Sequence, residues 1–191
     1  MFRVLVVCTG NICRSPMAEH LLREGLRARL GSEADTFVVV SAGTFGLTDN
    51  AMEPFAADTL RDEHGIDGTA FRAKALADFM VIGADLVLTA TRDHRAAAVT
   101  LQPQAARKTF TIREFDRLLS AIDPATLPTA DREARAHALV AAAASQRGLI
   151  RPDKPGDDDV TDPYRGPLAG YVTCAALLHG ALQRPLDLLA G

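Results

Sequence analysis

Ten residues near the N-terminus, VCTGNICRSP at positions 7–16, contain a cysteine and an arginine separated by five residues. The cysteine, Cys8, follows a short apolar run typical of a buried strand, and the Ser-Pro pair that closes the segment is typical of a helix start. At such a strand-to-helix junction, backbone N–H groups and the positive end of the helix can enclose an anion. Gly10 and Asn11 tolerate the left-handed backbone that a tight loop needs. The segment therefore predicts an oxyanion-binding loop.

The side chains of this loop could perform nucleophilic chemistry on a bound phosphoryl group. The electrostatic field of the loop favours the thiolate form of Cys8, and the Ser15 hydroxyl can donate a hydrogen bond to that sulfur. Arg14 offers a planar fork that can bind two phosphoryl oxygens, which a lysine could not copy. The alternative is an inert buried cysteine at the end of a strand, but this would leave the G-N-x-x-R-S-P context unexplained.

The elements that must position this loop alternate between apolar strands and amphipathic helices. This alternation predicts an α/β fold with a four-stranded parallel sheet and helices on both faces. The expected strands cover residues 2–7, 36–41, 85–90 and 108–112. One expected helix begins at Ser15-Pro16, and the others cover residues 54–64, 93–101, 113–121 and 168–189.

Residues 120–157 interrupt the alternation of strands and helices. The Ala-rich stretch 131–146 is a strong helix former. The polar stretch 152–159, with two prolines and three consecutive aspartates, follows it. We interpret 1–191 as one domain that carries a helical insertion at about 120–157.

The composition excludes several classes of partner. The chain has 191 residues and a net charge of −3, without a basic patch, so nucleic acid is not an expected partner. The apolar N-terminal run is too short for a signal peptide, and no apolar run is long enough to span a membrane. Three cysteines do not form a disulfide framework, which favours the reducing cytoplasm. The richness in Ala, Arg and Asp suggests a bacterial gene; the oligomeric state stays undetermined.

The loop resembles the phosphate-binding loop of the low-molecular-weight protein tyrosine phosphatases, whose pattern is V-C-x-G-N-x-C-R-S-P-x-A-E. Every fixed position of that pattern matches, through Ala18 and Glu19. The resemblance continues in the S-A-G-T sequence at 41–44, in ADLVL at 84–88 and in the D-P-Y sequence at 162–164. It implies the same four-stranded parallel sheet flanked by helices.

The resemblance also implies a mechanism and a set of site residues. Cys8 would attack phosphorus to form a phosphocysteine, Arg14 would stabilise the transferring group, and Asp162 would protonate the leaving phenolate and then activate water. No metal or cofactor is needed, and the partner would be a phosphotyrosine-containing protein in a signalling pathway. The residues expected to bind phosphate or support the loop are Thr9, Gly10, Asn11, Ile12, Cys13, Ser15 and Ser41.

The resemblance suggests which residues select the substrate. Tyr164 is expected to form one wall for an aromatic ring, and Phe45 is the candidate for the opposite wall. Related arginine phosphatases carry threonine at the position of Ile12, so an isoleucine favours phosphotyrosine. In the family, the second loop cysteine, Cys13, can form a protective disulfide with the nucleophile; a packing role is equally open. Cys174 is expected in the core.

The chain departs from the family at a position that normally supports the loop. Phe71 stands where many members have a histidine, so Asn11, Ser15 and Ser41 must hold the loop without it. We expect the aspartates at 157–159 to form a solvated loop. The five histidines (20, 64, 94, 137 and 179) show no ligand or triad spacing and are expected to be structural or exposed.

Two other functions remain as alternatives. A thiol-dependent arsenate reductase on the same fold normally needs two further cysteines close together in a mobile segment, which Cys174 alone cannot supply, although a variant that uses an external thiol needs fewer. A pseudoenzyme would bind phosphotyrosine without cleaving it. The presence of Cys8, Arg14 and Asp162 favours the phosphatase.

Overall fold

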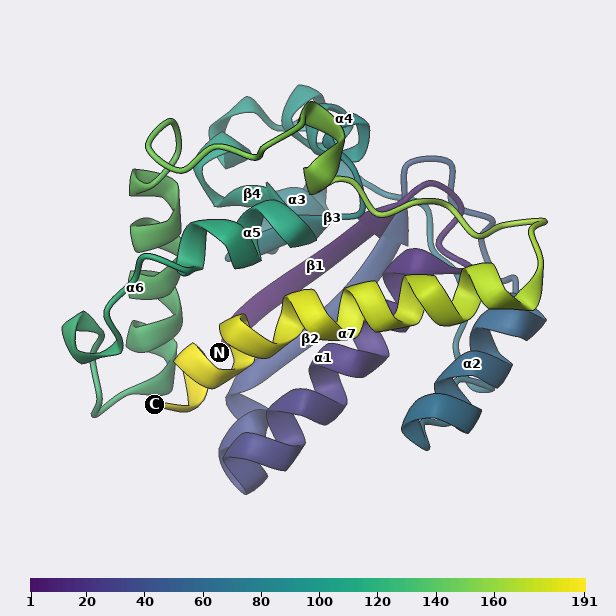
Figure 1. Cartoon of the computed structure of the whole chain (residues 1–191), viewed down its shortest axis with the longest axis horizontal. Coiled ribbons are helices and arrows are strands. Elements are labelled where there is room, and N and C mark those ends of the chain that lie inside the picture. The colour runs from purple at the N-terminus through teal and green to yellow at the C-terminus, as the bar shows by residue number, and fades with distance from the viewer.

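The protein forms a four-stranded parallel sheet with helices on both faces, as expected from the sequence (Figure 1). The computed structural model describes residues 1–191, apart from the side chain of Pro155. The strands are β1 (Phe2–Cys8), β2 (Phe37–Gly43), β3 (Leu86–Thr89) and β4 (Thr109–Thr111). The helices are α1 (Arg14–Leu30), α2 (Pro54–His64), α3 (Asp78–Gly83), α4 (Arg92–Leu101), α5 (Ile112–Leu119), α6 (Arg132–Ser145) and α7 (Leu168–Ala190).

The strand order β2-β1-β3-β4 brings the functional loops together. All neighbouring strands are parallel, and the register pairs Cys8 with Gly43 and Val7 with Thr89. The carboxyl ends of β1, β2 and β3 therefore meet at one edge of the sheet. The chain leaves β1 toward β2 and later crosses to β3 on the other side, and the edge beside such a reversal is where open α/β sheets bind ligands.

Alternate residues of β1 enter two separate hydrophobic cores, because successive side chains of a strand point to opposite faces. Val4 and Val6 join the larger core with α1, α5 and α7, whereas Leu5 and Val7 join a smaller one with α3 and α4. In Figure 1, α7 runs across the near face of the sheet in front of α1. A strand buried on both faces explains the nearly continuous apolar sequence of residues 2–7.

The segment from 120 to 157 is built mainly around α6, in agreement with the helix expected over 131–146. The Asp131 carboxylate caps this helix by accepting a hydrogen bond from the Glu133 amide at 2.9 Å. Leu139 and Ala143 on its inner face join the larger core. Arg135, only 2% exposed, donates hydrogen bonds to the carbonyl oxygens of Leu188, Leu127 and Pro128.

Two local expectations were wrong, and one helix was missed. Ser15 does not cap α1: the helix begins at Arg14 with Cys13 at the N-cap, because the Ser15 hydroxyl is used within the loop instead. Helix α5 begins before Arg113, since Thr111 and Glu114 form a capping box that ends β4 one residue early. The short helix α3 was not expected. Among the described residues, no helix is both long and apolar enough to cross a membrane.

Candidate active site

The loop from Cys8 to Arg14 connects β1 directly to α1, and its outward carbonyl groups are held by the chain that follows β2. The carbonyl oxygens of Cys8, Thr9, Gly10 and Ile12 accept backbone hydrogen bonds from residues 44, 45, 47 and 53, at 2.9–3.0 Å. With these oxygens engaged on the outside, the N–H groups of the loop can face its interior, next to the positive end of α1. An oxyanion-binding loop, as predicted from the sequence, requires such an arrangement.

Gly43 of the S-A-G-T sequence makes this close approach of the two loops possible. A Cβ atom at position 43 would lie 2.4 Å from the Thr9 carbonyl oxygen and 2.9 Å from the Asn11 nitrogen. Since both neighbours are backbone atoms, neither could move without distorting the loop. Any larger residue at Gly43 would therefore push the phosphate loop out of shape.

Asn11 is the centre of the network that holds the loop. It is fully buried and adopts the left-handed backbone conformation expected for it, with φ of 56°. Its amide nitrogen donates to the hydroxyls of Ser15 (2.9 Å) and Ser41 (2.8 Å), and its amide oxygen accepts from the Lys74 backbone at 2.7 Å. The loop is thus supported without the histidine that Phe71 replaces.

A second layer behind this network was not anticipated. The Ser41 hydroxyl, which accepts from Asn11, donates to the buried carboxylate of Glu19 at 2.6 Å. Glu19 in turn forms an ion pair with Arg23 at 2.9 Å. The available signal was the position of Glu19 in the P-x-A-E sequence, because a glutamate buried in an otherwise apolar helix face requires a partner.

Cys8 lies at the bottom of the loop, beside Ser15. The Cys8 sulfur and the Ser15 hydroxyl oxygen are 2.9 Å apart. Because that hydroxyl oxygen already accepts a hydrogen bond from the Asn11 amide, its own O–H is free to donate to the sulfur. A sulfur that accepts this hydrogen bond can do so as a thiolate, which has no proton of its own to donate.

Arg14 joins the loop to Asp162, which is 148 residues away in the sequence. Its Nη2 contacts the Asp162 carboxylate at 2.5 Å and the Thr9 hydroxyl at 3.3 Å, and its Nη1 donates to the Val160 carbonyl oxygen at 3.2 Å. The buried Nε has no hydrogen-bond partner among the residues that the structure describes. An unpaired buried guanidinium N–H is costly, so this atom is available to an oxyanion.

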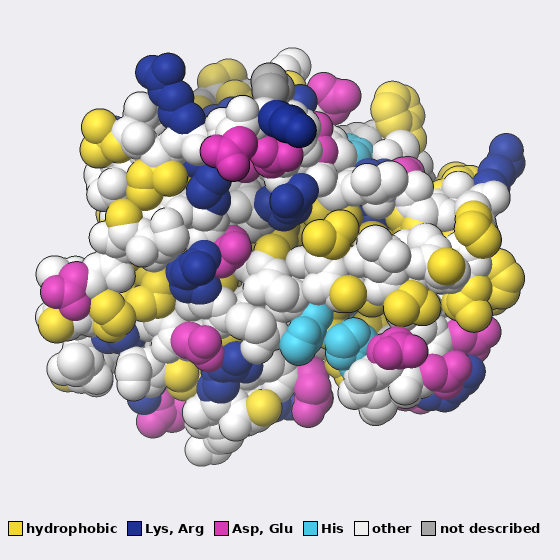
Figure 2. All heavy atoms as spheres, viewed as in Figure 1, with side chains coloured by type: hydrophobic (Ala, Val, Ile, Leu, Met, Phe, Trp, Pro, Cys, Tyr) yellow, Lys and Arg dark blue, Asp and Glu magenta, His cyan; other side chains and the backbone are white. Residues whose placement is uncertain are grey.

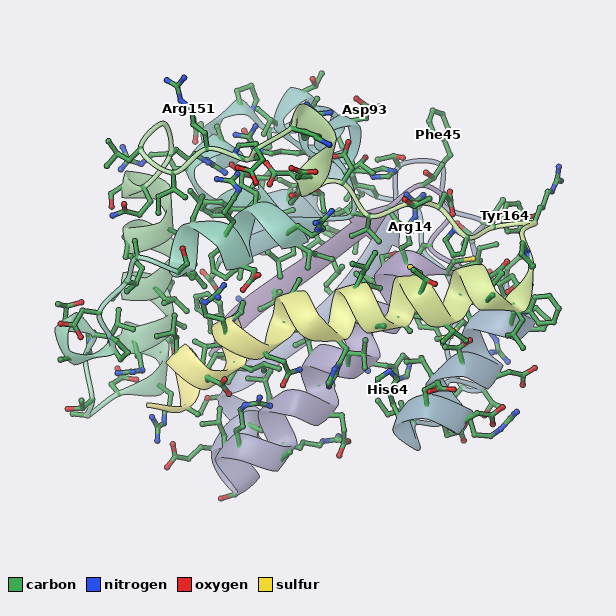
Figure 3. The ribbon with its side chains drawn as sticks, viewed as in Figure 1. Arg14, Phe45, His64, Asp93, Arg151 and Tyr164 are labelled. Atoms are coloured by element: carbon green, nitrogen blue, oxygen red, sulfur yellow. The ribbon has the colours of Figure 1, made fainter. Side chains whose placement is uncertain are left out.

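A cavity of about 180 Å³ opens above the loop. Cys8, Arg14 and Asp162 all line it. Its walls are the four side chains of Ile12, Phe45, Leu47 and Tyr164. Phe45 and Tyr164 are 79% and 45% exposed, and Figure 3 shows both at the same end of the molecule as Arg14. Figure 2 shows hydrophobic side chains at this same end of the molecule, over the starts of α2 and α7.

This geometry brings together Cys8, Arg14 and Asp162, the residues predicted for the catalytic centre. Comparison with known proteins identifies the family of the chain. The sequence profile described as "Low molecular weight phosphotyrosine protein phosphatase" matches residues 3–128. The chain belongs to this phosphatase family.

Individual relatives of the phosphatase include enzymes named for two different phosphorylated residues. The chain is 34% identical over 114 residues to the probable low molecular weight protein-tyrosine-phosphatase EpsP of Ralstonia solanacearum, an alignment that covers 60% of this chain and 72% of EpsP. It is 36% identical over 114 residues to the protein-arginine-phosphatase of Geobacillus stearothermophilus, covering 60% and 71% of the two chains. The low molecular weight protein tyrosine phosphatase structure from T. tengcongensis superposes with a TM-score of 0.71 at 30% identity, covering 98% and 99%.

Two residues of the phosphatase site were missed in the sequence. Leu47 lines the cavity together with Tyr164, and no sequence pattern singled it out. His94 is buried and its Nε2 lies 2.8 Å from the Thr9 hydroxyl, whereas all five histidines were expected to be merely structural or exposed. The available signal was its place just after β3, whose carboxyl end meets that of β1.

The two other cysteines of the phosphatase are protected by burial. Burial, followed by the negative charge of Glu53, raises the pKa of the Cys13 thiol well above its ordinary value. Burial also raises the pKa of Cys174, in α7, to about 12. Cys174 lies in the core as expected. The three cysteines are free in this structure, so a Cys8–Cys13 disulfide stays a prediction.

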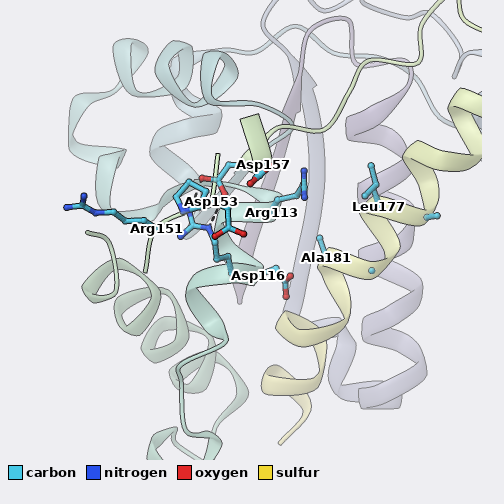
Figure 4. Close-up of a pocket in the computed structure, with 12 residues that line it drawn as sticks. Arg113, Asp116, Arg151, Asp153, Asp157, Leu177 and Ala181 are labelled. Carbon is cyan, nitrogen blue, oxygen red and sulfur yellow. Dashed lines mark hydrogen bonds and ion pairs between the residues drawn. The ribbon is translucent and has the colours of Figure 1, made fainter. Parts of the chain in front are cut away.

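The expectation of a solvated loop at the aspartates 157–159 was wrong for Asp158. Asp158 is buried and forms an ion pair with Arg117 at 2.8 Å, and Asp159 accepts from the Arg92 amide, also at 2.8 Å. Both are held because the chain there packs against α4 and α5. A different cavity lies here, between α5, α7 and residues 151–158 (Figure 4). The described residues contain no cluster of three or more potential metal ligands.

Proposed function

We propose that this protein hydrolyses phosphotyrosine in proteins, through a phosphocysteine intermediate on Cys8. The observation that carries the proposal is the convergence of Cys8, Arg14 and Asp162 on one cavity whose walls are apolar. Phosphoryl transfer needs a positioned nucleophile, neutralisation of the phosphoryl oxygens and protonation of the leaving group. Each of these needs has one residue beside the cavity that can meet it.

The first chemical step transfers the phosphoryl group to sulfur. The Cys8 thiolate attacks phosphorus, the sulfur–phosphorus bond forms, and the bond from phosphorus to the phenolic oxygen breaks. The loop N–H groups and the free Nε of Arg14 stabilise the equatorial oxygens. Asp162 gives its proton to the departing phenolate. In the second step Asp162 takes a proton from water, which attacks phosphorus and releases inorganic phosphate and the thiolate.

The ion pair between Arg14 and Asp162 links substrate binding to acid catalysis. The Arg14 guanidinium holds the Asp162 carboxylate at 2.5 Å. A phosphoryl group that enters the loop competes for the same guanidinium, because its oxygens carry more negative charge than one carboxylate. The Asp162 side chain, which is 47% exposed, is then free to take up a proton from solvent and to carry it to the leaving oxygen.

The cavity walls favour phosphotyrosine over phosphoarginine, the substrate class suggested by the name of the Geobacillus relative. Ile12, Leu47, Phe45 and Tyr164 offer apolar contact to a phenyl ring. A guanidinium substrate would require a carboxylate partner, and among the described cavity residues Asp162 is the single carboxylate. That carboxylate already pairs with Arg14. For these reasons we rank phosphoarginine second, after phosphotyrosine, as the candidate substrate.

The test is hydrolysis of p-nitrophenyl phosphate in EDTA, followed by a panel of phosphotyrosine, phosphoserine and phosphoarginine peptides. We expect activity without metal, its abolition by Cys8→Ser, and a fall in kcat of about 10²–10⁴ in Asp162→Asn, the range for general acid catalysis. Inorganic phosphate should bind Asp162→Asn at least as tightly as the unaltered protein, because the variant releases Arg14. Asp157→Asn, which changes an aspartate of the same loop outside the cavity, is the matched control.

Three results would refute the proposal. Binding of phosphotyrosine peptides without release of phosphate would indicate a pseudoenzyme. Reduction of arsenate with an added thiol, without hydrolysis of aryl phosphates, would indicate a reductase. A preference for phosphoarginine peptides would move the protein to the second candidate function.

We also propose that the protein acts in the cytoplasm of a bacterium, in signalling through tyrosine phosphate. The free state of Cys8, Cys13 and Cys174 is consistent with a reducing compartment. The bacterial origin of the relatives supports the same assignment. Fractionation of cells that produce the protein would test it, and recovery with the membrane or secreted fraction would contradict it.

A further inference from the structure

The start of α4 is attached to both loops of the active site. The Arg92 amide donates to Asp159 at 2.8 Å, and the Val160 amide donates to the Ala90 carbonyl oxygen at 2.8 Å. These bonds fix the chain that leads to Asp162. On the other side, His94 reaches the phosphate loop through Thr9. One short segment, residues 90–94, is therefore hydrogen-bonded to both the phosphate loop and the loop of the general acid, and fixes their relative position.

His94 itself is held at both ring nitrogens. Its Nδ1 lies 2.7 Å from the hydroxyl of Thr91, the N-cap residue of α4, and its Nε2 lies 2.8 Å from the hydroxyl of Thr9. The side chain is buried, with 7% of the residue exposed. Burial, followed by the positive charge of Arg14, lowers the pKa of His94 to about 4. The imidazole is thus neutral at neutral pH, with one nitrogen that donates and one that accepts.

The direction of these hydrogen bonds follows from Arg14. A guanidinium can only donate, so the Thr9 hydroxyl accepts from Arg14 Nη2 at 3.3 Å. The proton of that hydroxyl is then free to be donated to His94 Nε2, and Nδ1–H donates to Thr91. The result is a chain of hydrogen bonds from Arg14 through Thr9 and His94 to the first turn of α4.

We propose that His94 is a positioning residue for phosphoryl transfer, which holds the Arg14 guanidinium in place through the Thr9 hydroxyl. The proposal rests on the proposed function. Arg14 Nη2 contacts Asp162 and Thr9, and the contact with Asp162 ends when the carboxylate moves to the leaving group. Thr9 is then the side chain that still fixes Nη2. Without His94, the hydroxyl of Thr9 would be free to rotate, and the guanidinium would lose its alignment with the phosphoryl oxygens.

A matched pair of variants separates this role from a purely structural one. An asparagine amide occupies about the position of Nδ1, so His94→Asn keeps the contact with Thr91 and loses the one with Thr9. A glutamine amide reaches about the position of Nε2, so His94→Gln keeps the contact with Thr9 and loses the one with Thr91. If His94 only supports the Thr91 cap of α4, His94→Gln should lose more activity and phosphate affinity than His94→Asn. If His94 positions Arg14 through Thr9, His94→Asn should lose more of both.

The measurements are kcat/KM for p-nitrophenyl phosphate and the dissociation constant of inorganic phosphate by calorimetry. We expect His94→Asn to lower kcat/KM about tenfold and to weaken phosphate binding to a similar degree, the effect of losing about one hydrogen bond. His94→Gln should recover most of both losses. Equal losses in the two variants, or no loss in either, would overturn the proposal.

Thr9→Val breaks the same bond from the other side. It tests the proposal alone if the histidine variants do not fold, because unchanged phosphate binding in Thr9→Val would overturn the proposal. It should weaken phosphate binding about tenfold, and the double variant with His94→Asn should be no weaker than either single one. Additive effects would show that the two residues act independently and would reject the proposal. Phosphate binding requires no turnover, so the test stands even if the unaltered protein hydrolyses no aryl phosphate, a result that would refute only the proposed function.

Discussion

Replacement of Asn11 by alanine should destabilise the whole protein, because this side chain is the hub of the phosphate loop. The change removes three hydrogen bonds, to Ser15, Ser41 and Lys74, at 2.7–2.9 Å. At about 1 kcal/mol each, their loss costs about 3 kcal/mol. Alanine at a φ of 56° adds about 1 kcal/mol of backbone strain. The expected total of about 4 kcal/mol is a large part of the roughly 5–15 kcal/mol that stabilise a typical domain.

Urea unfolding followed by circular dichroism measures this loss as a shift of the midpoint at constant m-value. Asn11→Gly removes the same bonds without the left-handed strain, so it should be about 1 kcal/mol less destabilised than the alanine variant. Asn50→Ala, at an exposed asparagine, is the control and should change stability by less than about 0.5 kcal/mol. A loss below about 1 kcal/mol in Asn11→Ala would refute the reasoning that this network holds the loop.

Three further outcomes are expected from other parts of the molecule. Arg135→Met should lower the free energy of unfolding by about 3 kcal/mol, since three buried carbonyl oxygens lose their donor; a loss as small as in an exposed-site control would show that α6 does not depend on this arginine. Burial keeps the pKa of Cys13 and Cys174 raised, so iodoacetamide up to pH 9 should label Cys8 alone in the native protein, as read by mass spectrometry. Inorganic phosphate should protect Cys8 from this labelling, and equal labelling of all three thiols would contradict the prediction. Tyr164→Ala should raise KM for an aryl phosphate about 2–10-fold with little change in kcat, the loss of one aromatic contact; an unchanged KM would exclude Tyr164 as a wall.

The sequence by itself determined the parts of this protein that depend on neighbouring residues. The apolar run before Cys8, the turn residues of the loop and the Ser-Pro pair specify a strand, an anion-binding loop and a helix, because backbone propensity and hydrophobic periodicity are local properties. The same reasoning located α2 and α6 almost to the residue. The pattern around the loop also indicated the family, and the D-P-Y sequence indicated Asp162.

Only the tertiary structure decided which distant groups meet. The pairing of β1 with β3 brings His94 to Thr9, and the return of the chain past α4 brings Asp162 to Arg14. Likewise, the packing of residues 157–159 against α5 buries Asp158, although its sequence is that of an exposed loop. Such contacts depend on strand order and on the free energy of burying and pairing charges across the fold, and no local pattern of residues encodes either of them.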